Sequence, residues 1–258
     1  MNIASLIIFF ANSVLYFFIG HSLGKKSFEN NEDASAWRAY RTWWFGMSAN
    51  TALNGLAVLL LGLGASYLPV FVTLSLGATL AAAAALWGLL TYLMYIFRGS
   101  HTASRWIAGF YIAFGLFLFV SIYVFNPIGI TMGTWDPQVQ YENAPQGVFG
   151  LVYGVLLIVL LSLPPILASF GMFSLYFKLS ERSARFRSLL VPLGIFALFG
   201  LAYFIPLILI LVGINLSATS WWPLTIRLVG IAALMLIYFA YFPPAFVRRQ
   251  LQVKGILE

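Results

Sequence analysis

The chain has 258 residues, of which 62% are hydrophobic and 8% are charged, and its mean hydropathy is +0.93. Soluble globular proteins carry roughly 25% charged residues, so this composition excludes a soluble domain. The formal net charge is +7, and its placement along the chain indicates membrane topology rather than nucleic-acid binding. The absence of cysteine excludes a disulfide, a thiol nucleophile and a thiolate metal site.

Seven apolar segments are long enough to cross a bilayer, because a helix needs about 20 apolar residues to span the hydrocarbon core. The predicted helices cover residues 3–20, 43–63, 68–97, 106–125, 148–177, 189–214 and 221–242. No basic residue precedes the first segment, so we expect a retained helix rather than a cleaved signal peptide. The sequence therefore predicts an all-α membrane protein, with a single seven-helix transmembrane domain over residues 1–258.

The basic residues predict how these helices are oriented. Thirteen of the 14 Lys and Arg lie in or beside alternate connections and in the tail 245–258, while the three remaining connections hold none. Lys and Arg accumulate on the cytoplasmic side of membrane proteins. We therefore expect the N-terminus outside, the C-terminus in the cytoplasm, and a multi-pass protein of the plasma membrane.

Several arginines are predicted to form a cytoplasmic contact surface. They lie in the connection after the fifth predicted helix and in the tail: Arg182, Arg185, Arg187, Arg248 and Arg249. Basic clusters next to a membrane attract anionic lipid. We expect these side chains to contact anionic lipids of the inner leaflet or a cytoplasmic signalling protein.

The connection 126–147 is the one outer segment large enough to shape a recognition surface. It lacks basic residues and carries Trp135, Asp136 and Glu142. Its alternating pattern predicts a short hairpin or a cap lying on the membrane, with aromatic side chains at the interface. A ligand-recognition element and a plain connector with interfacial anchors are both compatible with this pattern.

Arg227 is the one charged residue predicted within a helix, about two turns from the outer side. A charge inside a membrane is a functional-site hypothesis by default. Three interpretations remain open at this stage: an ion pair with Asp136 or Glu142, a contact to an anionic ligand, and snorkelling toward the outer headgroups.

A pair of asparagines lies within the second predicted helix. Asn50 and Asn54 are four residues apart and so share one helix face. Side-chain amides in membrane helices usually hydrogen-bond to a neighbouring helix. The alternative is that this face contacts a buried polar ligand.

The residues needed for several kinds of chemistry are missing from the predicted helices. All seven carboxylates lie in loops or at the C-terminus, whereas ion-coupled transporters usually need carboxylates at depth. The last helix has no lysine for a retinal Schiff base. His21 and His101 lie at helix ends, where solvated side chains are expected rather than haem ligands. We therefore expect no enzyme, no metal and no cofactor.

Long stretches of the chain resemble the N-terminal seven-helix sensory region of certain bacterial membrane histidine kinases. The similarity lies in aromatic and glycine patterns: WWFGMSANTALNGLAVLLLGLGASYLPVF, ALWGLLTYLMYIFRG, FYIAFGLFLF, PIGITMGTWDPQVQYEN, LPPILASFGMFSLYFKLSERSARFRSLLV and FPPAFVRRQ. In such kinases the signalling domains follow the last of these stretches. The sequence here ends nine residues after Arg249. The resemblance therefore implies a stand-alone relative of the sensory region.

These observations favour a non-enzymatic module that senses an apolar or membrane-borne cue, or docks a partner. The residues expected to carry recognition are Arg227, Trp135, Asp136, Glu142, Asn50 and Asn54. A second hypothesis is a structural subunit of a larger respiratory or photosynthetic membrane complex. A third, a lipid or small-molecule carrier, is disfavoured because the sequence shows no coupling site.

Overall fold

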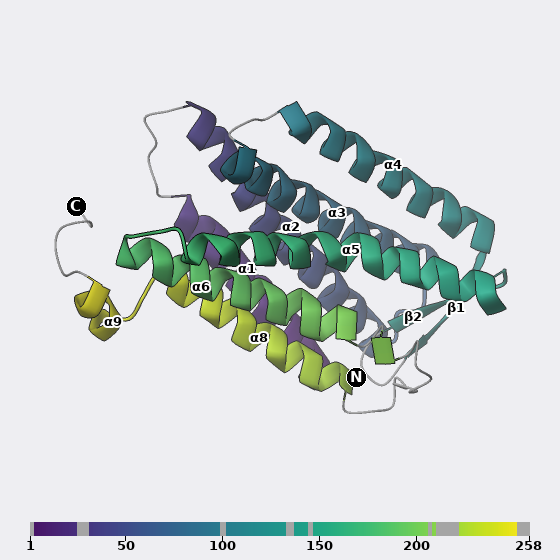
Figure 1. Cartoon of the computed structure of the whole chain (residues 1–258). Helices are drawn as coiled ribbons and strands as arrows, with labels where there is room; N and C mark the ends of the chain where they lie inside the picture. Colours follow the sequence, from purple (N-terminus) through teal and green to yellow (C-terminus); the bar gives the residue numbers. More distant parts are fainter. Residues whose placement is uncertain are drawn as a thin grey trace.

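The computed structural model describes residues 3–24, 31–98, 102–132, 137–143, 147–205, 208–209 and 222–251. Long helices run side by side in one bundle (Figure 1). The helices are α1 (Ile3–Leu23), α2 (Asn31–Gly62), α3 (Leu68–Arg98), α4 (Thr102–Phe125), α5 (Gly147–Tyr176), α6 (Arg182–Phe196), the π-helical η1 (Ala197–Phe204), α8 (Trp222–Tyr241) and α9 (Ala245–Leu251). Two strands, β1 (Pro127–Met132) and β2 (Pro137–Tyr141), pair at one end of the bundle.

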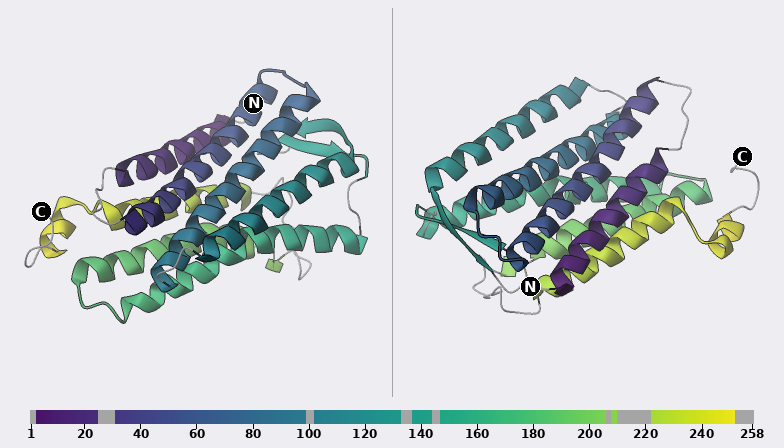
Figure 2. Two further views of the ribbon diagram at one scale, coloured as in Figure 1. Left: turned by 90° about the horizontal axis from the view of Figure 1, so that it is seen from above. Right: turned by 180° about the vertical axis from the view of Figure 1, so that it is seen from behind.

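Helix neighbours define the arrangement of the bundle. α1 packs between α2 and α8, α6 packs between α8 and α5, and α3 contacts both α2 and α5. These contacts close a ring of six helices, and α4 lies outside it, packed mainly on α3 (Figures 1 and 2). We call the end with the strands the hairpin end. The opposite end, where α5 meets α6 and α8 meets α9, is called the basic end.

Five helical segments within the described residues are long and apolar enough to cross a membrane: Ile3–Leu23, Ala34–Gly62, Leu68–Tyr95, Arg182–Leu201 and Thr225–Arg249. Their outward faces are apolar, with Ile7 and Phe18 about 60% exposed on α1, for example. Burying such surface requires a lipid environment rather than water. The chain is therefore a helical, multi-pass membrane protein.

Two helices extend further than hydropathy predicts. α2 begins at Asn31, twelve residues before the predicted start at residue 43. α6 begins at Arg182 instead of residue 189, so Arg182, Arg185 and Arg187 lie on a helix rather than in a loop. Hydropathy detects only the part of a helix that matches the hydrocarbon core. Backbone hydrogen bonding continues into the polar region, where arginine and alanine are good helix formers.

Two further features lie within the predicted helices: a pair of prolines in α5 and a π-helical segment after α6. α5 is one continuous helix through Pro164 and Pro165. The predicted helix 189–214 passes from α-helical to π-helical hydrogen bonding at Ala197–Phe204, and its residues 206–207 and 210–214 lie outside the described residues. A π segment leaves carbonyl groups without their usual partner, a change often found near functional sites.

The predicted outer connection forms a β-hairpin, as one of its two sequence-based interpretations expected. β1 and β2 are antiparallel, with Ile130 opposite Val139, and a bulge shifts the register between Pro127 and Gly129. The hairpin lies against α2 and α3. It therefore closes the hairpin end of the bundle over these two helices (Figure 1).

Small residues bring α2 and α3 close together. A Cβ built on Gly88 would lie 2.4 Å from the Ala39 carbonyl oxygen, and one built on Gly46 would lie 2.7 Å from the Ala81 carbonyl oxygen. Because these glycines have no side chain, the backbones of α2 and α3 can approach closely. Close packing of this kind holds helices together in lipid, where no hydrophobic effect drives their association. The largest buried side chains, among them Trp43 and Trp44, lie on α2 within this core.

Candidate functional site

A cavity of about 520 Å³ lies where the hairpin meets the helices. We call it the hairpin pocket; its walls are Phe9 of α1, Asn54 and Ala57 of α2, Phe71 and Ser75 of α3, and Pro137, Val139 and Tyr141 of β2. Sites for small molecules usually have volumes of about 300–1,000 Å³ and combine apolar walls with a few polar groups. The size and mixed lining of this pocket fit that description.

Strand geometry explains how β2 covers the pocket. Successive side chains of a strand point to opposite faces, so residues 137, 139 and 141 lie on one face. This face supplies the three β2 residues of the lining. Phe71 and Ser75 are four residues apart on α3 and therefore share a helix face below it. β2 of the hairpin therefore covers one side of the pocket, and side chains of α1, α2 and α3 line the other side.

Asn50 and Asn54 share a helix face as predicted, but they have different roles. The Asn50 side-chain amide donates to the Ala78 carbonyl oxygen at 2.8 Å, which ties α2 to α3. The Asn54 amide donates to the Asn50 carbonyl oxygen at 2.9 Å, within α2. Asn54 also lines the hairpin pocket. Asn50 therefore stabilises the helix pair, and Asn54 is the asparagine available to a ligand.

Glu142 holds the base of the hairpin. Asn126 Nδ2 donates to Glu142 Oε2 at 2.6 Å, and the Glu142 amide donates to the Asn126 carbonyl oxygen at 3.0 Å. Asn126 has a φ of +48°, a conformation that asparagine tolerates better than most residues. The Glu142 side chain is exposed and does not line the pocket. The other two predicted recognition residues of this segment, Trp135 and Asp136, lie outside the described residues.

Arg227 of α8 reaches across to α1. Its Nη1 donates to Ser5 Oγ at 2.6 Å, and its Cζ lies 4.4 Å from the centre of the Phe9 ring. A hydrogen bond from a charged donor and a cation–π contact both hold the guanidinium in place. Phe9 also lines the hairpin pocket, so Arg227 supports one wall of it. Arg227 and Asn54 therefore both lie at the hairpin end of the bundle. Phe9 connects them, because it contacts Arg227 and lines the hairpin pocket together with Asn54.

The predicted cytoplasmic arginines all lie at the basic end, on α6 and α9 (Figure 1). Arg182, Arg248 and Arg249 are exposed, and Arg185 is exposed above the Tyr176 ring, at 4.8 Å from its centre. Arg187 differs, because it is half-buried and donates to the carbonyl and hydroxyl oxygens of Ser183.

An aromatic cluster at the basic end was not predicted as a unit. Tyr40 stacks on Tyr92 with ring centres 4.3 Å apart, and the Tyr241 hydroxyl donates to the Tyr40 hydroxyl at 3.0 Å. Trp37 contacts the same rings and donates to the Leu23 carbonyl oxygen at 2.7 Å. The spacing of Trp37, Tyr40 and Trp44 along one helix face was the available signal. Their partners on α3 and α8 could be found only from the tertiary structure.

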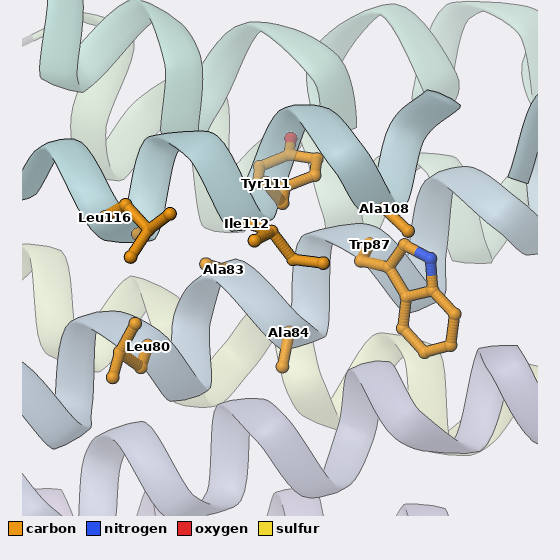
Figure 3. A pocket seen from close by; sticks show the side chains of 9 residues that line it. Leu80, Ala83, Ala84, Trp87, Ala108, Tyr111, Ile112 and Leu116 are labelled. Atoms are coloured by element: carbon orange, nitrogen blue, oxygen red, sulfur yellow. The ribbon is translucent and has the colours of Figure 1, made fainter. Parts of the chain in front are cut away.

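A second cavity, of about 550 Å³, is a groove between α3 and α4 (Figure 3). Alanines keep it open: Ala83 and Ala84 come from α3, and Ala108 comes from α4 (Figure 3). Leu80 and Leu116 lie at one end of the groove and Trp87 at the other. Its walls consist of apolar and aromatic residues.

No cluster of three potential metal ligands of the His, Cys, Asp or Glu type occurs among the residues that the structure describes. The hairpin pocket offers an amide, two hydroxyls and three aromatic rings instead. Comparison with known proteins adds no assignment, because no family model and no curated protein matches the chain.

Proposed function

We propose that this chain is a sensory module of the plasma membrane that binds a small, membrane-borne molecule in the hairpin pocket. The observation that carries the proposal is the pocket itself, where one face of β2 covers polar and aromatic side chains from three helices. The opposite, basic end of the bundle would pass the resulting change to a cytoplasmic partner. The resemblance to sensory regions of histidine kinases supports the same conclusion.

The proposed topology has seven spans, with the N-terminus outside and the C-terminus in the cytoplasm. Five spans are the apolar segments named above. The other two are α4 and α5, with 24 and 30 residues, which at 1.5 Å per residue are about 36 and 45 Å long. Each exceeds the ~30 Å hydrocarbon core. This topology places the hairpin outside and the basic end inside, as the distribution of Lys and Arg indicates.

The polar groups of the hairpin pocket favour binding over catalysis. Asn54, Ser75 and Tyr141 supply an amide and two hydroxyls. These groups donate and accept hydrogen bonds, and none is a carboxylate or an imidazole, the side chains that most often perform general acid–base catalysis. Phe9 and Phe71 would contact the apolar part of the ligand.

The test compares two tryptophan variants on the same helix. Ser75 and Thr73 are both exposed residues of α3, but only Ser75 lines the pocket. The wild-type chain and the variants Ser75→Trp and Thr73→Trp would each be extracted gently from the membrane. Mass spectrometry would then identify the small molecules that co-purify with each of the three. We expect a stoichiometric species that Thr73→Trp retains and Ser75→Trp loses. Retention by both variants, or no bound species in the wild type, would contradict the proposal.

A second candidate function, an accessory subunit of a larger membrane complex, is favoured by α4. This helix packs mainly on α3 and leaves large apolar side chains uncovered, with Trp106 82% and Ile112 65% exposed. A subunit would cover this face with a neighbouring chain. Companion chains in fixed ratio after gentle extraction would establish this function instead, whereas a lone chain that stays folded would remove it.

A further inference from the structure

The basic end carries exposed arginines on two separate elements. Arg182 and Arg185 lie in the first turns of α6, and Arg248 and Arg249 lie on α9 (Figure 1). Glu181, the carboxylate adjacent to Arg182, accepts a hydrogen bond from Ser183. Concentrated positive charge at one end of a membrane protein creates a field that attracts anions within about a Debye length.

α9 has two chemically different faces. At 100° per residue, Arg248 and Arg249 lie on one side of this short helix, Val247 and Leu251 lie on the other, and Phe246 lies between the two sides, next to Arg249. The Phe246 side chain is 69% exposed. A helix with a basic face and an uncovered aromatic side chain suits the boundary between headgroups and acyl chains.

α9 lies beyond the end of α8, at the basic end of the bundle (Figure 1). It follows α8 after the Pro243–Pro244 pair, and its residues Ala245–Arg249 form the last part of the apolar segment Thr225–Arg249. The two further views show α9 turning away from the axis of α8 (Figure 2). A short helix that leaves a membrane-spanning helix in this way meets the headgroup layer first. Phe177, directly after α5, is 73% exposed at the same end of the bundle.

We propose that Arg182, Arg185, Arg248 and Arg249 form a binding surface for the headgroups of anionic phospholipids. Guanidinium groups form bidentate, charge-assisted hydrogen bonds to phosphate oxygens. Phe246 and Phe177 then enter the acyl boundary beside the bound headgroup. A membrane lipid, rather than a soluble phosphorylated protein, is the occupant because exposed aromatic side chains flank the arginines. The surface is separate from the hairpin pocket and does not depend on the proposed sensory function.

The experiment measures lipid binding to the purified full chain in detergent by native mass spectrometry. The probes are phosphatidylglycerol, which is anionic, and phosphatidylcholine with the same acyl chains. We expect the wild type to prefer phosphatidylglycerol. The double variant Arg248→Gln/Arg249→Gln should weaken this binding by about 30-fold, the equivalent of about 2 kcal/mol for two arginines near a membrane surface. Arg248→Lys/Arg249→Lys should keep most of the affinity.

Two further variants separate a specific surface from general charge. Arg38→Gln removes an exposed positive charge from α2 and should leave the phosphatidylglycerol affinity unchanged within about 2-fold. Phe246→Ser alters an exposed side chain, leaves the charge intact and should weaken binding of the anionic lipid by several-fold. Equal binding of the two lipids by the wild type would overturn the proposal. So would a loss for Arg38→Gln that matches the loss per charge at α9.

Discussion

Ser13 of α1 and Ser48 of α2 exchange hydrogen bonds across the helix interface. Ser48 Oγ donates to the Ser13 carbonyl oxygen at 2.9 Å, and Ser13 Oγ donates to the Ser48 carbonyl oxygen at 3.0 Å. Both side chains are buried, with 8% of each exposed. These two hydrogen bonds tie α1 to α2 at a point where small side chains let the helix backbones come close.

The first prediction concerns this pair. Ser48→Ala removes a side-chain hydrogen bond between helices and should lower the free energy of unfolding by about 1 kcal/mol, in the range found for such bonds in membranes. Thermal unfolding of the purified chain in detergent would measure the change. Ser174→Ala is the control, because Ser174 is exposed and its hydroxyl donates within its own helix, to the Gly171 carbonyl oxygen. An equal effect of the two changes would contradict the proposed role of the pair.

The second prediction concerns the close contact of α3 with α2. In Gly88→Ala, the new Cβ would lie 2.4 Å from the Ala39 carbonyl oxygen and 2.9 Å from the Trp43 backbone nitrogen. Both atoms belong to the backbone, so the helices must move apart, at a cost of about 1–3 kcal/mol. Gly109→Ala on α4 is the matched control, since a Cβ there meets nothing within 4 Å.

Gly109→Ala should leave the free energy of unfolding unchanged or raise it by up to about 1 kcal/mol, because alanine favours the helix more than glycine does. The melting temperatures of Gly88→Ala and Gly109→Ala should therefore shift in opposite directions, or only the first should fall. A melting temperature of Gly88→Ala equal to that of the wild type would show that α2 and α3 do not approach so closely.

The third prediction concerns Arg227. Arg227→Met keeps an unbranched, flexible side chain but removes the guanidinium, and with it the hydrogen bond to Ser5 and the cation–π contact with Phe9. We expect a loss of about 1–3 kcal/mol in stability, because Ser5 is fully buried and loses a charged donor. Unfolding in detergent would measure it. If Arg227 only snorkels to the headgroups, Arg227→Met should instead leave the stability unchanged.

The fourth prediction concerns the proposed topology and uses the absence of cysteine in the chain. Asn143 lies at the base of the hairpin and Arg249 lies on α9, and both side chains are exposed. Each would be replaced by a single cysteine, giving Asn143→Cys and Arg249→Cys. A membrane-impermeant maleimide should label Asn143→Cys in intact cells. It should label Arg249→Cys only after the cells are opened. The reverse pattern would place the hairpin in the cytoplasm.

Much of the helical framework could be predicted because transfer into lipid depends on local composition. The expected helices at 3–20, 68–97 and 148–177 lie within a few residues of α1, α3 and α5. The predictions failed where hydropathy carries no information about helix ends. The starts of α2 and α6 are polar, and hydrogen bonding inside each helix, rather than lipid, extends them.

The candidate site was predicted only in part. Asn54 and Arg227 were singled out because a polar or charged residue in an apolar helix is unusual, and both lie at the hairpin end. Phe9, Phe71 and Ser75 are ordinary residues for a membrane helix, so their sequence context gave no signal. Glu142 attracted attention as a charge, yet its contact with Asn126 gives it a structural role.

The amino-acid sequence by itself determined that this is a multi-pass helical membrane protein, because apolar segments of this length are stable only where lipid replaces water around them. It also determined that positive charge lies in or beside alternate connections between the segments. Only the tertiary structure decided which helices are neighbours, that Arg227 contacts Ser5 and Phe9, and that β2 covers the hairpin pocket. These contacts depend on the side-chain shapes of helices far apart in the chain, which no local pattern encodes.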